Sequence, residues 1–97
     1  MSNKNICCEI LESKIETAGK RGLAVIPFKS PYKPFNYIFF LQSRNIDEEN
    51  KTGIHTVIDI AIKYCPWCGT NLSTLIEIDE KLIESIAFRN KHLIKLF

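Results

Sequence analysis

The chain has 97 residues, of which 45% are hydrophobic and 25% charged, and its formal net charge is +2. These values are typical of one small globular domain, and so small a charge is too weak to attract the whole molecule to nucleic acid. The longest apolar run, residues 38–41, is far shorter than the ~20 residues of a membrane span. Residues 1–15 lack a basic segment leading into an apolar one, so we expect no signal peptide, no membrane partner and a cytoplasmic protein.

A short helix is predicted at residues 5–19. Apolar residues recur there at a spacing that places them on one face of a helix, namely Ile6, Ile10, Leu11, Ile15 and Ala18. Asn5 is a suitable N-terminal cap, and Gly19 is a suitable stop at the C-terminal end.

Three strands are predicted at residues 23–29, 37–43 and 54–64. Pro27 is typical of an edge strand, because proline cannot donate a backbone hydrogen bond to a neighbouring strand. The third segment alternates with period two, which predicts one buried face and one face in water. The residues of the predicted buried face are Ile54, Thr56, Ile58, Ile60, Ile62 and Tyr64. We expect an antiparallel meander whose apolar face packs on the N-terminal helix.

The last part of the chain predicts a short strand at residues 74–78 and a helix at residues 79–97. Asp79 is a suitable cap for this helix. Its apolar face consists of Leu82, Ile83, Ile86, Leu93, Ile94 and Phe97. This face either joins the core or forms the interface of a homodimer.

The most specific motif is Cys-Pro-Trp-Cys-Gly at residues 65–69, directly after the third predicted strand. Two cysteines separated by two residues can bind one tetrahedral ion if the backbone turns tightly between them. Pro66 fixes φ for such a turn, and Gly69 suits the position after the second cysteine, which commonly needs a positive φ. Cys65 and Cys68 are therefore predicted ligands of one structural Zn²⁺ ion in a zinc knuckle.

A structural zinc site normally has four protein ligands, and the remaining cysteines are Cys7 and Cys8. Both fall in the first turn of the predicted helix, where free N–H groups and the helix dipole favour thiolates. Four thiolates around one divalent ion would cancel the net charge of the chain. Two alternatives stay open. Either one of this pair is a core residue and His55 or His92 is the fourth ligand, or the cysteines bind no metal.

The same motif is similar to the Cys-Pro-x-Cys active site of glutaredoxins, which predicts thiol–disulfide exchange as a further alternative. In glutaredoxins the first cysteine begins a helix, and most of the domain follows it. Here fewer than a third of the residues follow Cys68, and Gly69 would lie unfavourably inside that helix. Cys7 and Cys8 would also have no role, so a metal site is the preferred interpretation.

The adjacent Cys7 and Cys8, together with Tyr-Cys-Pro-Trp-Cys-Gly-Thr-Asn-Leu at residues 64–72, resemble a family of small, uncharacterised bacterial zinc-knuckle proteins. The shared pattern is a vicinal pair of cysteines and a Tyr- or Phe-Cys-Pro-Trp-Cys-Gly motif. The resemblance implies that Cys7, Cys8, Cys65 and Cys68 bind zinc, and it implies no activity. We expect one zinc-binding domain over residues 1–97, with a family-like core at 1–72 and a helical extension at 73–97.

The predicted fold is therefore α+β: a small antiparallel three-stranded sheet with an N-terminal helix, a zinc knuckle and a C-terminal helix. Four cysteines around one ion leave no open position for catalysis, so we expect a protein that is not an enzyme. The preferred hypothesis is action through protein–protein interaction, as an inhibitor or a bacterial toxin-neutralising immunity protein.

A nucleic-acid-binding zinc-ribbon protein is the alternative function. It requires basic residues to gather on one face, namely Lys29, Lys33, Arg44, Lys51 and Lys63. Residues 29–37 interleave lysines with aromatic residues. This pattern suits stacking on single-stranded nucleic acid, a partner-binding edge or closure of the core.

Overall fold

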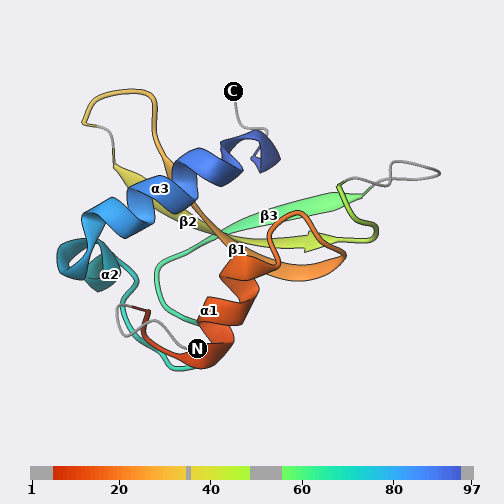
Figure 1. The fold of residues 1–97 in the computed structure, drawn as a ribbon, viewed down its shortest axis with the longest axis horizontal. Helices are drawn as coiled ribbons and strands as arrows, with labels where there is room; N and C mark the ends of the chain where they lie inside the picture. Colours follow the sequence, from red (N-terminus) through yellow and green to blue (C-terminus); the bar gives the residue numbers. More distant parts are fainter. Residues whose placement is uncertain (1–5, 35, 49–55, 95–97) are drawn as a thin grey trace.

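The computed structural model describes residues 6–34, 36–48 and 56–94. In chain order these form α1 (Glu9–Glu16), β1 (Gly22–Lys29), β2 (Tyr37–Arg44), β3 (Val57–Ile62), α2 (Ser73–Ile78), α3 (Glu80–Asn90) and a 3₁₀ turn, η1 (Lys91–Leu93). This is the predicted α+β fold, with an N-terminal helix, a three-stranded antiparallel sheet and a C-terminal helix (Figure 1). None of the helices in these three ranges has the length and apolar character that a membrane crossing requires.

The sheet is a meander with strand order β1-β2-β3. Across it, Val25 pairs with Leu41, which pairs on its other side with Ile60. The strand that carries Pro27 is therefore an edge strand, as predicted. Both α1 and α3 pack against β1, and Figure 1 shows the two helices beside it.

Buried side chains pack on both faces of the sheet, because successive strand residues point to opposite sides. The larger cluster joins one face to all three α-helices and includes Leu11, Ile15, Val25, Phe39, Leu75, Ile83 and Ile86. The smaller cluster joins the opposite face to the end of the chain and consists of Ile26, Phe28, Phe40, Leu93 and Ile94. The apolar face of the C-terminal helix thus contributes to the core of this chain; Phe97 lies outside the described residues.

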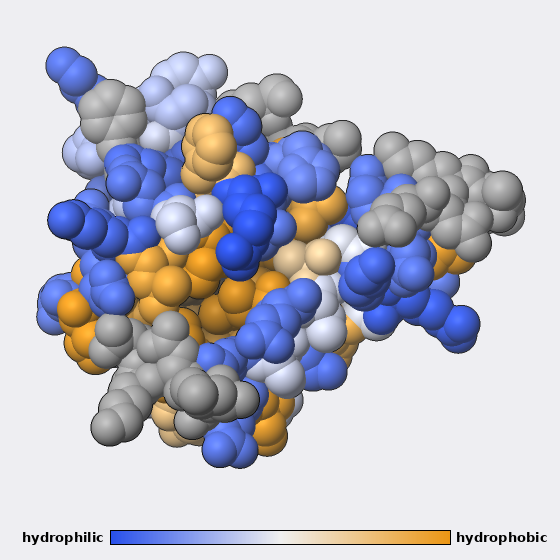
Figure 2. Space-filling view, in the orientation of Figure 1, coloured by the Kyte–Doolittle hydropathy of each residue, from blue (hydrophilic) through white to orange (hydrophobic). Residues whose placement is uncertain are grey.

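Figure 2 shows apolar side chains between α1 and α3, bordered by polar ones. A shallow cavity of about 150 Å³ lies between the two helices, and Ile15 and Ile86 contribute to its lining. The first helix begins later than predicted, since Cys8 is its N-cap and Glu9 its first residue. Ile10, expected on the inner face, is 49% exposed. The predicted cap Asn5 lies outside the described residues.

Residues 74–78 form most of helix α2, so the predicted strand is wrong. Leu72 and Leu75 are each 1% exposed, and their three-residue spacing places both on the same side of a helix. Asn71 supports the start of α2, because its Oδ1 accepts a hydrogen bond from the Ser73 N–H at 3.0 Å. The chain then changes direction at Asp79, which caps α3 as predicted by accepting from the Leu82 N–H at 3.2 Å.

Two of the three isoleucines of β3, Ile58 and Ile60, are exposed, contrary to prediction, whereas Ile62 on the same face is half-buried and packs against the larger core cluster. Ile58 and Ile60 are 54% and 56% exposed, whereas Asp59 on the other face is half-buried. The reason is position in the sheet: β3 is the edge strand opposite β1, and the helices pack against β1. Ile54 and His55 lie outside the described residues.

A buried polar network joins β2 to β3 and to η1. Gln42 is fully buried and donates from Nε2 to Asp59 Oδ1 at 2.8 Å and to the Leu93 carbonyl at 2.9 Å. Arg44, which is 5% exposed, donates from Nε to Gln42 Oε1 at 2.9 Å and from Nη1 to Glu48 Oε2 at 2.8 Å. Arg44 is therefore an internal structural residue and not part of a basic surface.

Candidate metal centre

The four cysteine sulfurs come together in one cluster, all within 4.8 Å of one another. Cys8 Sγ lies 3.7 Å from Cys65 Sγ, and Cys7 Sγ lies 3.1 Å from Cys68 Sγ. Each of these contacts joins the start of α1 to the segment after β3. The structure thus brings together all four residues that the sequence predicts as ligands.

The segment after β3 folds back on itself as the motif predicts. Tyr64 and Asn71 form an isolated β-bridge, and the Cys65 N–H donates to the Thr70 carbonyl at 2.8 Å. The Gly69 N–H donates to the Cys65 carbonyl at 2.9 Å, and Gly69 has a φ of +79°. This tight turn directs the sulfurs of Cys65 and Cys68 toward the same point.

The N-terminal pair reaches the cluster from a helix cap and not from the first turn, which corrects the prediction. Cys8 has extended backbone angles, with φ −159° and ψ 160°, and its Sγ accepts a hydrogen bond from the Leu11 N–H at 3.4 Å. This N–H is one of the unpaired donors at a helix N-terminus. Because Cys8 precedes the helix, the chain bends beside Cys7 and lets two adjacent side chains reach one cluster.

Burial differs among the four cysteines. Cys65 is 2% exposed and packs in the larger core cluster, whereas Cys68 is exposed at the surface. Hydrogen bonding to Thr70, whose Oγ1 lies 3.2 Å from the sulfur, lowers the pKa of the Cys68 thiol to about 6. Burial raises the pKa of the Cys7 and Cys8 thiols above the ordinary value. A nearby cation would oppose this rise, because it stabilises thiolates.

The cluster has the chemistry of a thiolate metal site, and one of its sulfur–sulfur distances matches a tetrahedral ion. Sulfurs bound to a tetrahedral ion at about 2.3 Å lie ~3.8 Å apart, and the Cys8–Cys65 distance of 3.7 Å is close to this value. Four cysteines are therefore placed to bind one metal ion. Among residues 6–34, 36–48 and 56–94, no other group of three or more His, Cys, Asp or Glu side chains gathers in this way.

The alternative ligands and the alternative chemistry receive no support from these contacts. His92 is exposed and is not part of the cluster, and His55 lies outside the described residues. The glutaredoxin arrangement requires Cys65 to begin a helix, but a turn follows it and α2 begins only at Ser73. A helix N-terminus is one of the features that activate a redox cysteine, and neither Cys65 nor Cys68 lies at one.

Thr70 is a residue that sequence reasoning missed. Its side chain contacts the sulfur of Cys68 and its carbonyl accepts from the Cys65 N–H, so it supports both cysteines of the knuckle. The sequence feature that could have indicated this role is a hydroxyl side chain two residues after the second cysteine of the motif.

Replacement of Gly69 by alanine should weaken metal binding. A non-glycine residue at this φ is strained by about 1–2 kcal/mol, and relief of that strain would open the turn that holds Cys65 and Cys68. Gly22→Ala is the matched control, because Gly22 has a φ of +104° and no atom near its added Cβ, as at Gly69.

Competition with a chelator measures the effect of these two variants. Both should lose similar stability when metal-free, but only Gly69→Ala should release its metal at lower chelator concentration. Equal metal affinity in the two variants would contradict a role of the knuckle turn in binding.

Comparison with known proteins gives no match among family models, curated proteins or solved structures. The resemblance to bacterial zinc-knuckle proteins therefore remains a prediction, and the functional interpretation depends on the geometry described above.

Proposed function

We propose that the chain is a non-enzymatic zinc protein in which Cys7, Cys8, Cys65 and Cys68 bind one structural Zn²⁺ ion, and that the folded domain acts by binding a protein partner. The observation that carries this proposal is that four sulfurs from two distant segments lie in one cluster. The sequence separation between Cys8 and Cys65, whose sulfurs are in contact, is 57 residues. The resemblance to bacterial zinc-knuckle proteins agrees with it.

Zinc is the ion that best suits this set of ligands. Thiolates favour soft or borderline ions, and a four-sulfur tetrahedral arrangement is typical of structural zinc or of iron–sulfur centres. The 3.7 Å between the sulfurs of Cys8 and Cys65 is close to the ~3.8 Å expected for two sulfurs on one tetrahedral ion, which supports a single ion. With four protein ligands the ion has no position for substrate, so its role is to hold the structure.

The ion would act as a cross-link between α1 and the end of β3. A domain of this size buries only ~60–65% of the surface that its unfolded chain exposes, and small domains often need a metal or a disulfide for stability. Because a metal bound only by the folded chain contributes its binding energy to folding, the site would stabilise the whole domain.

A protein partner is favoured over nucleic acid by the environment of the basic residues. The nucleic-acid hypothesis requires Arg44 at the surface, but Arg44 is 5% exposed and pairs with Glu48. Lys29 is paired with Glu84 at 2.6 Å, and Lys51 lies outside the described residues. An inhibitor, such as a bacterial toxin-neutralising immunity protein, is one concrete version of a protein-binding function.

Metal analysis of the purified, untagged protein tests the zinc site. Native mass spectrometry should show one zinc ion per chain, and Cys65→Ser should abolish it. His55→Ala and His92→Ala are the controls and should retain full zinc, because neither histidine is a ligand in this proposal. A compact protein without metal, or one that holds iron in place of zinc, would overturn the assignment.

Reconstitution tests the protein-binding role. A protein captured from an extract should be identified, purified and shown to bind the zinc-loaded chain in a fixed ratio. Binding of nucleic acid that weakens steeply with salt, with no protein bound under the same conditions, would contradict the proposal.

A further inference from the structure

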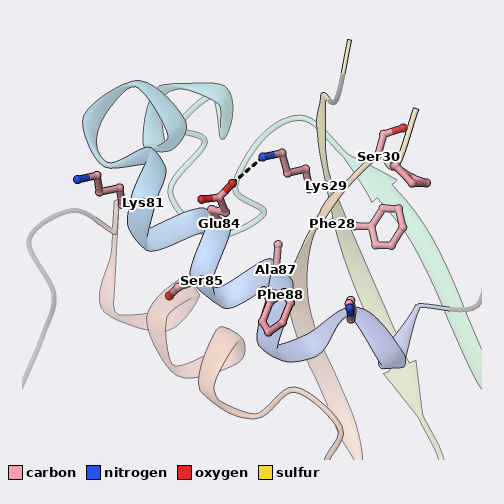
Figure 3. Close-up of a pocket in the computed structure, with 10 residues that line it drawn as sticks. Phe28, Lys29, Ser30, Lys81, Glu84, Ser85, Ala87 and Phe88 are labelled. Carbon is pink, nitrogen blue, oxygen red and sulfur yellow. Dashed lines mark hydrogen bonds and ion pairs between the residues drawn. The ribbon is translucent and has the colours of Figure 1, made fainter. Parts of the chain in front are cut away.

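A groove lies between the end of β1 and the outer side of α3, and no cysteine contributes to its lining. Its volume is about 640 Å³, within the range of ligand sites in proteins. Figure 3 shows Phe28 on the strand side and Phe88 on the helix side, with Lys29 reaching across to Glu84. The ion pair ties β1 to α3 and so holds the two walls of the groove together.

The helix wall of the groove presents an aromatic ring to solvent. Ile83, Ile86 and Ala87 of α3 are buried, whereas Phe88 is 71% exposed. The residues at helical spacing on the groove side are Lys81, Glu84, Ser85 and Phe88. Phe28, which is 8% exposed, supplies a second aromatic residue to the lining. An exposed apolar surface bordered by polar residues is typical of an interaction site.

The charge around this apolar floor is positive. Three lysines line the groove, namely Lys29, Lys81 and Lys91. The one acidic residue of the lining is Glu84, and it is paired with Lys29. Lys81 and Lys91 have no ion-pair partner in the described part of the chain, and Lys91 Nζ lies 4.6 Å from the centre of the Phe88 ring. Within the described residues, these two lysines, one toward each end of the groove, are therefore not paired with a carboxylate.

We propose, building on the protein-binding function above, that this groove binds an acidic segment of the protein partner, with an apolar or aromatic side chain placed between two carboxylates. The carboxylates would pair with Lys81 and Lys91, and the apolar side chain would pack between Phe28 and Phe88. Ten residues separate the two lysines along the helix, a distance of ~15 Å at 1.5 Å per residue. An extended segment of about five residues covers this distance.

A nucleic acid fits this groove less well than a short acidic segment. Its phosphates form a continuous chain of charge, whereas Lys81 and Lys91 are the two lysines of the lining without an ion-pair partner in the described part of the chain.

A labelled peptide tests this proposal directly on the zinc-loaded full chain. The probe is the capped sequence Glu-Ala-Trp-Ala-Glu carrying fluorescein, and its binding is measured by fluorescence anisotropy. Lys81→Glu and Lys91→Glu should each weaken binding about tenfold, since each reverses one charge contact. Phe88→Ala should also weaken it about tenfold. Lys63→Glu is the matched control, because Lys63 is exposed and lies outside the groove, and it should bind like wild type.

The same probe defines the results that would overturn the proposal. The proposal is wrong if the peptide does not bind wild type, or if it binds Lys63→Glu and Lys91→Glu equally well. It is also wrong if wild type binds a short deoxythymidine strand more tightly than the peptide. The peptide with lysines in place of its glutamates must bind at least tenfold more weakly. All the substituted positions are exposed, and thermal melting confirms that each variant is folded.

Binding of the reconstituted protein partner distinguishes the groove assignment from the proposed protein-binding function. If wild type and a Lys81→Glu, Lys91→Glu double variant bind that partner equally, the groove assignment is wrong and the protein-binding function stands. If the peptide binds the groove but no protein partner is ever reconstituted, the groove assignment stands and the proposed function fails.

Discussion

Cys68→Ser is expected to lower the free energy of unfolding by about 3 kcal/mol or more, although the side chain lies at the surface. An ordinary surface substitution changes stability by only ~0.5 kcal/mol. Cys68 is exposed, so serine brings no cost of burying a hydroxyl there, and a large loss would report on the metal alone. Structural zinc in small domains contributes on the order of 10 kcal/mol, and removal of one of four ligands should remove a sizeable part of it.

Urea unfolding with and without a chelator provides the measurement. In the absence of chelator, wild type should be far more stable than Cys68→Ser; with excess chelator, the two proteins should become nearly equal. Lys63→Ser is the control at an exposed neighbouring position and should stay within ~0.5 kcal/mol of wild type in both conditions. If Cys68→Ser and Lys63→Ser behave alike, the cluster does not hold a stabilising ion.

Cys65→Ser should be more damaging than Cys68→Ser, for a reason that the metal does not supply. Cys65 is 2% exposed within the larger core cluster, so serine there also buries a hydroxyl, at a cost of about 1–3 kcal/mol. The difference between the two variants should therefore persist in excess chelator. This residual difference separates the packing role of Cys65 from its role as a ligand.

The site was more predictable from sequence than much of the fold. A Cys-x-x-C spacing followed by glycine constrains the backbone strongly, and the turn with Gly69 at positive φ is present as expected. That Cys7 and Cys8 would meet this turn followed only from counting ligands. The sequence could not show that Cys8 caps the helix, because a sulfur acceptor at a helix start carries a weak signal compared with Ser, Thr, Asp or Asn.

The errors in the fold share one cause. Local periodicity reports the repeat of a segment but not which neighbours will cover it. The alternating isoleucines of β3 predicted a buried face, yet Ile58 and Ile60 are half exposed because the helices pack against the other edge of the sheet. Likewise, the segment at residues 74–78 is too short for its sequence pattern to distinguish a strand from a helix. In the structure it is helical, and this places Leu72 and Leu75 in the core.

The buried hydrogen-bond network around Gln42 could not be predicted from the sequence, and its loss should destabilise the domain strongly. Gln42→Leu should lower the free energy of unfolding by about 2–4 kcal/mol, even though leucine is apolar and similar in volume. The change removes the hydrogen bonds that Gln42 makes with the Leu93 carbonyl and with the Nε of Arg44. Loss of the partner of a buried polar group costs about 1–3 kcal/mol, and more when the group is charged.

Thermal melting is the measurement, and for a domain of this size the expected loss corresponds to a fall in Tm on the order of 10–20 °C. Ser43→Ala is the matched control, since Ser43 is the next residue of β2, is half-buried on the opposite face and should change Tm by only a few degrees. The combination of Gln42→Leu with Asp59→Leu should cost less than the sum of the two single changes, because Gln42 donates to Asp59 at 2.8 Å and the two residues share one interaction. Strict additivity would mean that Gln42 and Asp59 are not coupled.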